Sequence, residues 1–158
     1  MAYIRGMSRA FVKEDDDAPE ELPERIVSTA PNLVTAEGLA AIEAEIARLN
    51  DELAALDADD RSGRAPIARD LRYWTARRGS AQLVAPPPDN EIVRFGATVT
   101  VARDDGRQQT FRIVGEDEAN PERGTLSHVS PLAQALLGKS EGDVVRVAGG
   151  EAEIIAIT

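Results

Sequence analysis

The chain has 158 residues, of which 29% are charged, and its formal net charge is −10 at pH 7. This length favours one or two small domains. The sequence contains no cysteine, which excludes disulfides and thiolate zinc sites, and one histidine, His128, which excludes a His-rich metal cluster. No apolar run reaches the roughly 18 residues of a membrane span, and the N-terminus has no hydrophobic signal core. We therefore expect a soluble cytoplasmic protein with no membrane partner.

Charge is distributed unevenly along the chain. Residues 1–60 carry 5 basic and 15 acidic groups, residues 61–88 carry 6 arginines and 1 aspartate, and residues 89–158 carry 7 basic and 12 acidic groups. A net charge this negative repels phosphate backbones, so nonspecific duplex binding is not expected. The arginine block between the acidic stretches is the place where an anionic partner would be met.

Residues 1–32 have the composition of an acidic tail. Acidic runs alternate with Pro19, Pro23 and Pro31, and few residues are suited to a core. Such a segment cannot offset its ordering entropy, so we expect it to be disordered as far as Asn32. The sequence leaves open the role of this tail and whether Met1 or Met7 is the true start.

Residues 33–84 predict two helices that form an antiparallel coiled-coil hairpin. The first has apolar residues at alternating spacings of 3 and 4, typical of a coiled-coil seam, with Thr35 as N-cap. Its seam is Leu39, Ile42, Ile46, Leu49, Leu53 and Leu56. The second helix is expected to start at Pro66, after a turn over 57–66. Its seam is Ile67, Leu71, Trp74, Arg78 and Ala81, and Trp74 is expected to pack near Leu49 or Leu53.

The remainder predicts a Pro-rich linker over 85–91 and a compact β-rich domain over 92–158. Strands are expected at 97–101 and 109–114 around a turn at 104–106, and again at 124–127. A short helix is expected to begin at the N-cap Ser130 and to be closed by Gly138. A last hairpin joins 143–147 to 151–157, which gives an α+β domain.

Five sequence blocks follow one another in this C-terminal part. They are Phe95–Val101, Phe111–Ala119, Ser127–Lys139, Gly142–Val145 and Gly149–Glu153. In this order, and behind a helical hairpin, they resemble the Gre transcript-cleavage factors (GreA/GreB). The resemblance implies an N-terminal antiparallel α-helical coiled-coil hairpin followed by an FKBP-like antiparallel β domain with one short helix.

The same resemblance implies a bacterial transcription elongation factor whose C-terminal domain docks on RNA polymerase at the rim of the secondary channel, while the hairpin enters the channel. The factor would not be an enzyme, because the polymerase itself hydrolyses backtracked RNA. It would have no cofactor of its own, since the Mg²⁺ belongs to the polymerase active site, and no small-molecule substrate. It is expected to be a monomer that meets the nascent RNA 3′ end only indirectly.

Carried over to this sequence, the family's acidic tip corresponds to Asp57 and Asp60, with Asp59 nearby, as ligands of the Mg²⁺ shared with polymerase. The docking element corresponds to Ser130, Pro131 and Leu132. Arg61 and Arg64 are candidates for contact with RNA or the channel wall. The same aspartates also suit a solvated turn, and the arginines also suit a surface paired with the acidic first helix.

Several functional alternatives follow. The arms are shorter than the family's by what looks like two to three turns, which would withdraw the tip by roughly 11–16 Å. This favours a short-armed, non-cleaving polymerase modulator similar to Rnk over a cleavage stimulator, and leaves activation or inhibition open. An FKBP-like prolyl isomerase is a remote alternative, and a coiled-coil adaptor is a third.

Overall fold

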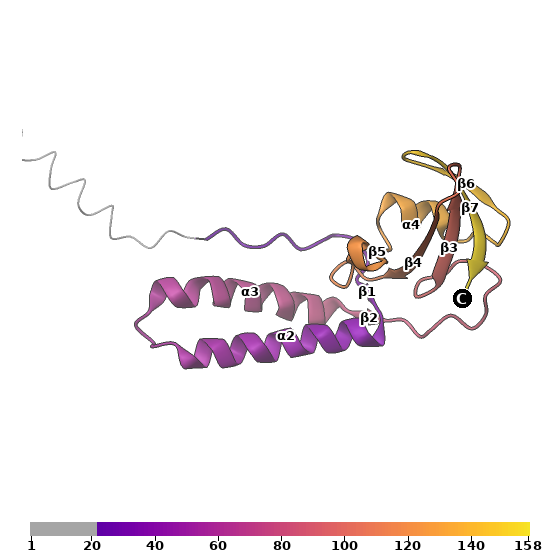
Figure 1. Ribbon diagram of the computed structural model, residues 1–158. Helices are drawn as coiled ribbons and strands as arrows, with labels where there is room; N and C mark the ends of the chain where they lie inside the picture. Colours follow the sequence, from indigo (N-terminus) through magenta and orange to yellow (C-terminus); the bar gives the residue numbers. More distant parts are fainter. Residues whose placement is uncertain (1–21) are drawn as a thin grey trace, which may run out of the picture.

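Two helices of 20 residues form the N-terminal arm of the computed structural model, which describes residues 22–158. Helix α2 spans Ala36–Ala55 and α3 spans Arg61–Ser80. They lie side by side and antiparallel, and they project from a small sheet domain (Figure 1). At about 1.5 Å per residue each helix is about 30 Å long. None of the helices in this described part has the length and apolar content needed to span a bilayer.

The first helix follows its sequence pattern. Thr35 is the N-cap, as predicted, and its hydroxyl accepts a hydrogen bond from the Gly38 amide at 3.0 Å. Ile42 and Leu49 are buried, and the other predicted seam residues are half-buried. The predicted apolar stripe is therefore the face that α2 turns toward the interior of the arm.

The second helix begins earlier than predicted. Its first residue is Arg61 and its N-cap is Asp60, so Pro66 lies inside the helix instead of opening it. Asp60 provides a side-chain acceptor for Gly63 N–H, and a proline near the helix start removes only one backbone hydrogen bond. The shorter turn shifts the pairing of the arms. Trp74 consequently lines a pocket with Gly38 and Ile42, closer to the base of the arm than the predicted Leu49 or Leu53.

The predicted seam of α3 is wrong at Arg78. The Arg78 side chain is 58% exposed and pairs with Glu43 at 3.7 Å, whereas Arg77 is 1% exposed. The physical reason is that α3 packs against the sheet domain as well as against α2. Its buried face therefore includes a position that the two-helix pattern assigns to solvent.

Two short strands close the base of the arm. Strand β1, Leu33–Val34, pairs in parallel with β2, Gln82–Leu83. The sequence did not predict either strand, because a segment of two residues is too short to show the alternating apolar pattern of a strand. Residues 84–97 then form an irregular connection to the sheet domain and bury Val93 in its core.

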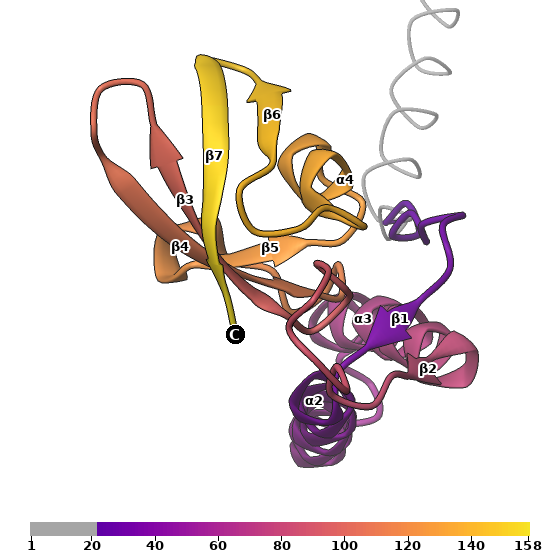
Figure 2. The same ribbon diagram turned by 90° about the vertical axis from the view of Figure 1, so that its right-hand side faces the viewer.

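The sheet domain holds a five-stranded sheet in the order β5-β4-β3-β7-β6 (Figure 2). Its strands are β3 Thr98–Arg103, β4 Gln108–Val114, β5 Thr125–Ser127, β6 Val144–Val147 and β7 Gly150–Ile157. The prediction of an antiparallel domain is wrong for one pair, since β4 and β5 are parallel. Residues 115–124, which include the 3-10 helix η2 Pro121–Arg123, carry the chain back before β5 begins. The sheet is therefore mixed.

A single core lies between the sheet and helix α4, Pro131–Leu136. Ser130 caps this helix and Gly138 follows it at φ +82°, both as predicted. The buried residues are Val93, Phe95, Ala97, Val99, Val101, Ile113, Leu126, Ala133, Leu136, Val145, Ala152, Ile154 and Ile157. This core places α4 and the Ser130–Leu132 element at a fixed position beside β6.

The expectation of disorder up to Asn32 does not describe residues 22–32. We call residues 22–30 the strap, which has no helix or strand but runs along α3 (Figure 1). Asn32 is buried, and its amide donates to the Arg77 carbonyl at 2.7 Å. Amino-acid composition did not predict that these residues are ordered, because the contacts that order them are made with side chains of α3. Residues 1–21 lie outside the described residues.

Candidate functional site

The three predicted tip aspartates lie together in the turn between α2 and α3, and all are exposed. The Asp60 amide donates to the Asp57 carbonyl at 3.1 Å, and the Arg61 amide donates to the Asp59 carbonyl at 2.9 Å. One carboxylate oxygen of Asp60 accepts the Gly63 amide at 3.0 Å. Asp60 is therefore partly committed to capping α3, whereas Asp57 and Asp59 present their carboxylates to solvent.

Within residues 22–158, no group of three His, Cys, Asp or Glu side chains is placed to hold a metal ion. A hard cation such as Mg²⁺ takes six oxygen ligands. The tip carboxylates fit the chemistry of a shared ion, for which the remaining ligands have to come from a partner and water.

The two predicted tip arginines, Arg61 and Arg64, lie in different environments. Arg64 turns back and donates to the carbonyls of Leu53 and Leu56, at 3.1 and 3.4 Å. It thus adds a donor to the last carbonyls of α2, of which that of Leu53 also accepts the Leu56 amide at 3.3 Å. A positive charge at this end is also favoured by the helix dipole. Arg61 is exposed at the start of α3. Arg64 holds the turn closed, and Arg61 faces solvent.

A polar junction joins the arm to the sheet domain through residues 115–118, which we call the acidic loop. The buried Arg77 guanidinium donates to Asp117 at 2.6 Å and to Asn32 at 2.8 Å, and it lies 3.5 Å from Glu116. Burial alone would lower the pKa of Arg77, but the hydrogen bond and charge of Asp117 outweigh burial and raise it. The Tyr73 hydroxyl donates to the same Asp117 carboxylate at 2.5 Å. Burial, followed by this hydrogen bond, raises the pKa of Tyr73 to about 12.

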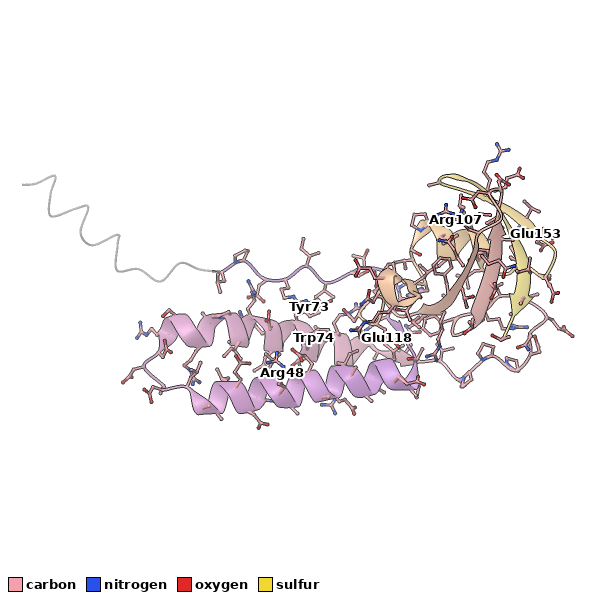
Figure 3. All side chains as sticks on the ribbon, in the orientation of Figure 1. Arg48, Tyr73, Trp74, Arg107, Glu118 and Glu153 are labelled. Atoms are coloured by element: carbon pink, nitrogen blue, oxygen red, sulfur yellow. The ribbon has the colours of Figure 1, made fainter. Side chains whose placement is uncertain are left out.

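The last residue of the acidic loop reaches the start of α2 (Figure 3). Glu118 accepts from the backbone amides of Thr35 and Gly115, at 3.1 and 3.0 Å, and pairs with the Thr35 hydroxyl. A β-carbon on Gly38 would lie 2.1 Å from the Glu118 carboxyl carbon, so glycine permits this approach. The junction holds both helices of the arm. Sequence reasoning missed it, although Glu116, Asp117 and Glu118 stand out as three consecutive acids after a strand.

The predicted docking residues line a groove of about 540 Å³ beside α4. The Ser130 hydroxyl caps the helix by accepting the Ala133 amide at 3.3 Å, Pro131 is exposed, and Leu132 is half-buried. Other parts of the fold complete the lining with Arg103, Leu126, Arg146, Val147 and Ala148. The groove thus combines an apolar floor with two arginines. Sequence reasoning missed these arginines because they come from β3 and β6.

His128 lies where the sheet domain meets the end of the N-terminal segment. It is 6% exposed, its ring meets the Phe95 ring edge-on with centroids 5.6 Å apart, and its Nε2 has no hydrogen-bond partner among the described residues. Burial lowers the pKa of His128, and the charge of Glu116 opposes this effect. The ring is a buried packing element.

Residues 88–158 match the protein family described as "Transcription elongation factor, GreA/GreB, C-term". The C-terminal domain belongs to the GreA/GreB family. The chain is 48% identical over 82 residues to the transcription elongation factor GreA of Paracoccus denitrificans, and the match covers 49% of this chain and 53% of that protein. It is 44% identical over 81 residues to GreB of Neisseria meningitidis, which covers 50% of each. The chain spans about half the length of these curated relatives.

Two solved structures are similar over most of the chain. One is GreA factor homolog 1 (Gfh1) of Thermus thermophilus, with a TM-score of 0.40 and 20% identity over 82% of this chain and 99% of that one. The other is GreA/GreB of Nitrosomonas europaea, with a TM-score of 0.40 and 19% identity over the same shares of the two chains.

Proposed function

We propose that this Gre-family chain is a bacterial transcription elongation factor that binds RNA polymerase in the cytoplasm, at the secondary channel, and regulates elongation. The observation that carries the proposal is the match of residues 88–158 to the GreA/GreB C-terminal domain. The projecting two-helix arm supports it, because a rod joined to a domain with an exposed groove suits insertion into a channel beside a docking point.

The groove beside α4 is the proposed docking site, and its occupant is an acidic, aliphatic-bearing element of the polymerase. Pro131, Leu132 and Val147 offer apolar surface, and Arg103 and Arg146 offer positive charge. Exposed apolar side chains flanked by arginine are typical of interface centres. The groove lining includes no aromatic side chain, and for this reason we do not propose a prolyl isomerase activity for the sheet domain.

In this proposal the two-helix arm enters the secondary channel and carries out no catalysis itself. The acidic loop fixes the base of both helices, so the tip aspartates are held at a defined distance from the docking groove. Any RNA hydrolysis belongs to the polymerase, and exposed Asp57 and Asp59 would at most add oxygen ligands to a polymerase-bound Mg²⁺.

A second mechanism is favoured by the arm itself. Both helices have only 20 residues, and Asp60 gives one carboxylate oxygen to its helix cap. A short probe with one committed carboxylate suits a modulator similar to Rnk, which occupies the channel and competes with longer Gre factors without stimulating cleavage.

Binding to purified bacterial core polymerase tests the proposal. The full chain should bind, and Leu132→Arg should weaken binding at least tenfold by placing charge in the apolar part of the groove. Leu83→Arg is the matched control, because Leu83 is 59% exposed on β2 and should bind like the parent chain. Absence of binding by the parent chain would overturn the proposal.

A stalled, backtracked transcription complex separates the two mechanisms. A cleavage stimulator shortens the RNA in a Mg²⁺-dependent way, and the double variant Asp57→Asn with Asp60→Ser should abolish this effect. Serine keeps the N-cap of α3, so loss of activity reports the carboxylates and not the helix. A modulator leaves the RNA intact and slows cleavage by an added longer Gre factor.

A further inference from the structure

The strap contacts one face of α3 through two neighbouring side chains. Glu24 accepts three hydrogen bonds from the Arg72 guanidinium, at 2.5 to 3.1 Å. The Arg25 guanidinium lies 3.8 Å from the ring centre of Tyr73 and 5.5 Å from that of Trp74, and 3.5 Å from Asp70. The strap therefore covers both the charged and the aromatic part of this face.

These contacts hold the strap weakly. Residues 22–27 are all exposed, and Ile26 is 93% exposed, so these residues bury no side chain against the arm or in the core of the sheet domain. Exposed ion pairs and cation–π contacts each contribute little to stability. The strap can therefore leave α3 without unfolding the arm.

Among the described residues, the buried anchor of the strap is at its C-terminal end. Buried Asn32 accepts from Arg77 Nη2 at 2.8 Å and donates to the Arg77 carbonyl, and β1 follows directly. Residues 28–31 connect this anchor to the Glu24 and Arg25 contacts and have no helix or strand. This arrangement permits the strap to swing away while its C-terminal end stays in place.

We propose that the strap is an autoinhibitory cover of the arm, which has to leave α3 before the arm enters the polymerase. The inference rests on the proposed function and adds its regulation. With the strap in place, the cross-section of the arm includes one more backbone segment. Its side chains Arg72, Tyr73 and Trp74 are then in contact with Glu24 and Arg25. Strap closure and polymerase binding compete for the same face, so the covered fraction lowers the apparent affinity.

The first measurement follows the strap in the free chain. Trp74 is the only tryptophan of the sequence, so its fluorescence and its quenching by acrylamide report this face. The double variant Glu24→Gln with Arg25→Gln removes both contacts and keeps the net charge. Quenching of Trp74 should increase about twofold. The matched control, Asp105→Asn with Arg107→Gln, removes an exposed ion pair on the β3–β4 turn and should leave quenching unchanged.

The second measurement is the affinity of the same proteins for core polymerase. The uncovered variant should bind about three- to tenfold more tightly than the parent, and the control variant should bind like the parent. Unchanged quenching in the uncovered variant, or unchanged or weaker polymerase binding, would overturn the autoinhibitory strap. Failure of parent and control to bind at all would instead overturn the proposed function, and the strap inference with it.

Discussion

At the scale of single residues, buried His128 makes the stability of the fold depend on pH. Burial lowers its pKa below the ordinary value of about 6.5, so the folded chain binds a proton less readily than the unfolded chain. The stability that depends on neutral His128 is complete above about pH 6.5 and is lost as the pH falls toward the folded-state pKa. The charge of Glu116 reduces this effect without reversing its direction.

We therefore predict that the free energy of unfolding decreases between pH 7.5 and 5.5, by no more than about 1.4 kcal/mol per pH unit, the limit for uptake of one proton. Urea unfolding at several pH values measures it. His128→Gln should show a flatter dependence over this interval. An equal slope in the two proteins would mean that other groups cause it.

At the scale of elements, the helix boundaries depend on caps more than on proline. Pro66 is a strong sequence signal for a helix start, yet α3 begins at Arg61 because Asp60 caps it and Arg64 bonds to the end of α2. The strands of the sheet domain follow their alternating pattern closely. Strands β1 and β2 do not appear in any pattern, because their pairing is set by the ends of the two helices.

Asp60→Ala should destabilise the chain by about 0.5–2 kcal/mol, the usual cost of losing an N-cap, measured by thermal or urea unfolding. Asp60→Ser should retain most of the stability because serine also caps. Asp59→Ala, an exposed change beside the cap, should stay within about 0.5 kcal/mol of the parent. A stable Asp60→Ala variant would show that Arg64 alone holds the turn.

At the scale of the whole molecule, Arg77 links three parts of the chain that are remote in sequence. Its guanidinium, 1% exposed, meets Asn32 before β1, and Glu116 and Asp117 in the acidic loop. Removing one partner of a buried ion pair leaves the other charge uncompensated. The junction is therefore the point where the arm and the sheet domain depend on each other.

Arg77→Met should lower the free energy of unfolding by about 3–5 kcal/mol, because Asp117 loses its partner while its surroundings stay buried. Urea unfolding followed by far-UV circular dichroism measures the loss. Arg78→Met is the neighbouring control, and at 58% exposure it should change stability by less than about 0.5 kcal/mol. Equal effects of the two variants would contradict the structural role of Arg77.

Periodicity and neighbours a few residues away were enough to predict the two helices of the arm, the strands and turns of the C-terminal domain, and the caps Thr35 and Ser130. The sequence also indicated the tip aspartates and the Ser130–Leu132 element, both of which the fold leaves accessible. Three other features follow from the three-dimensional fold alone. Arg77 is buried while Arg78 is exposed, β4 and β5 run parallel, and Arg103 and Arg146 line the groove. Each of these depends on contacts between distant segments, which no local pattern encodes.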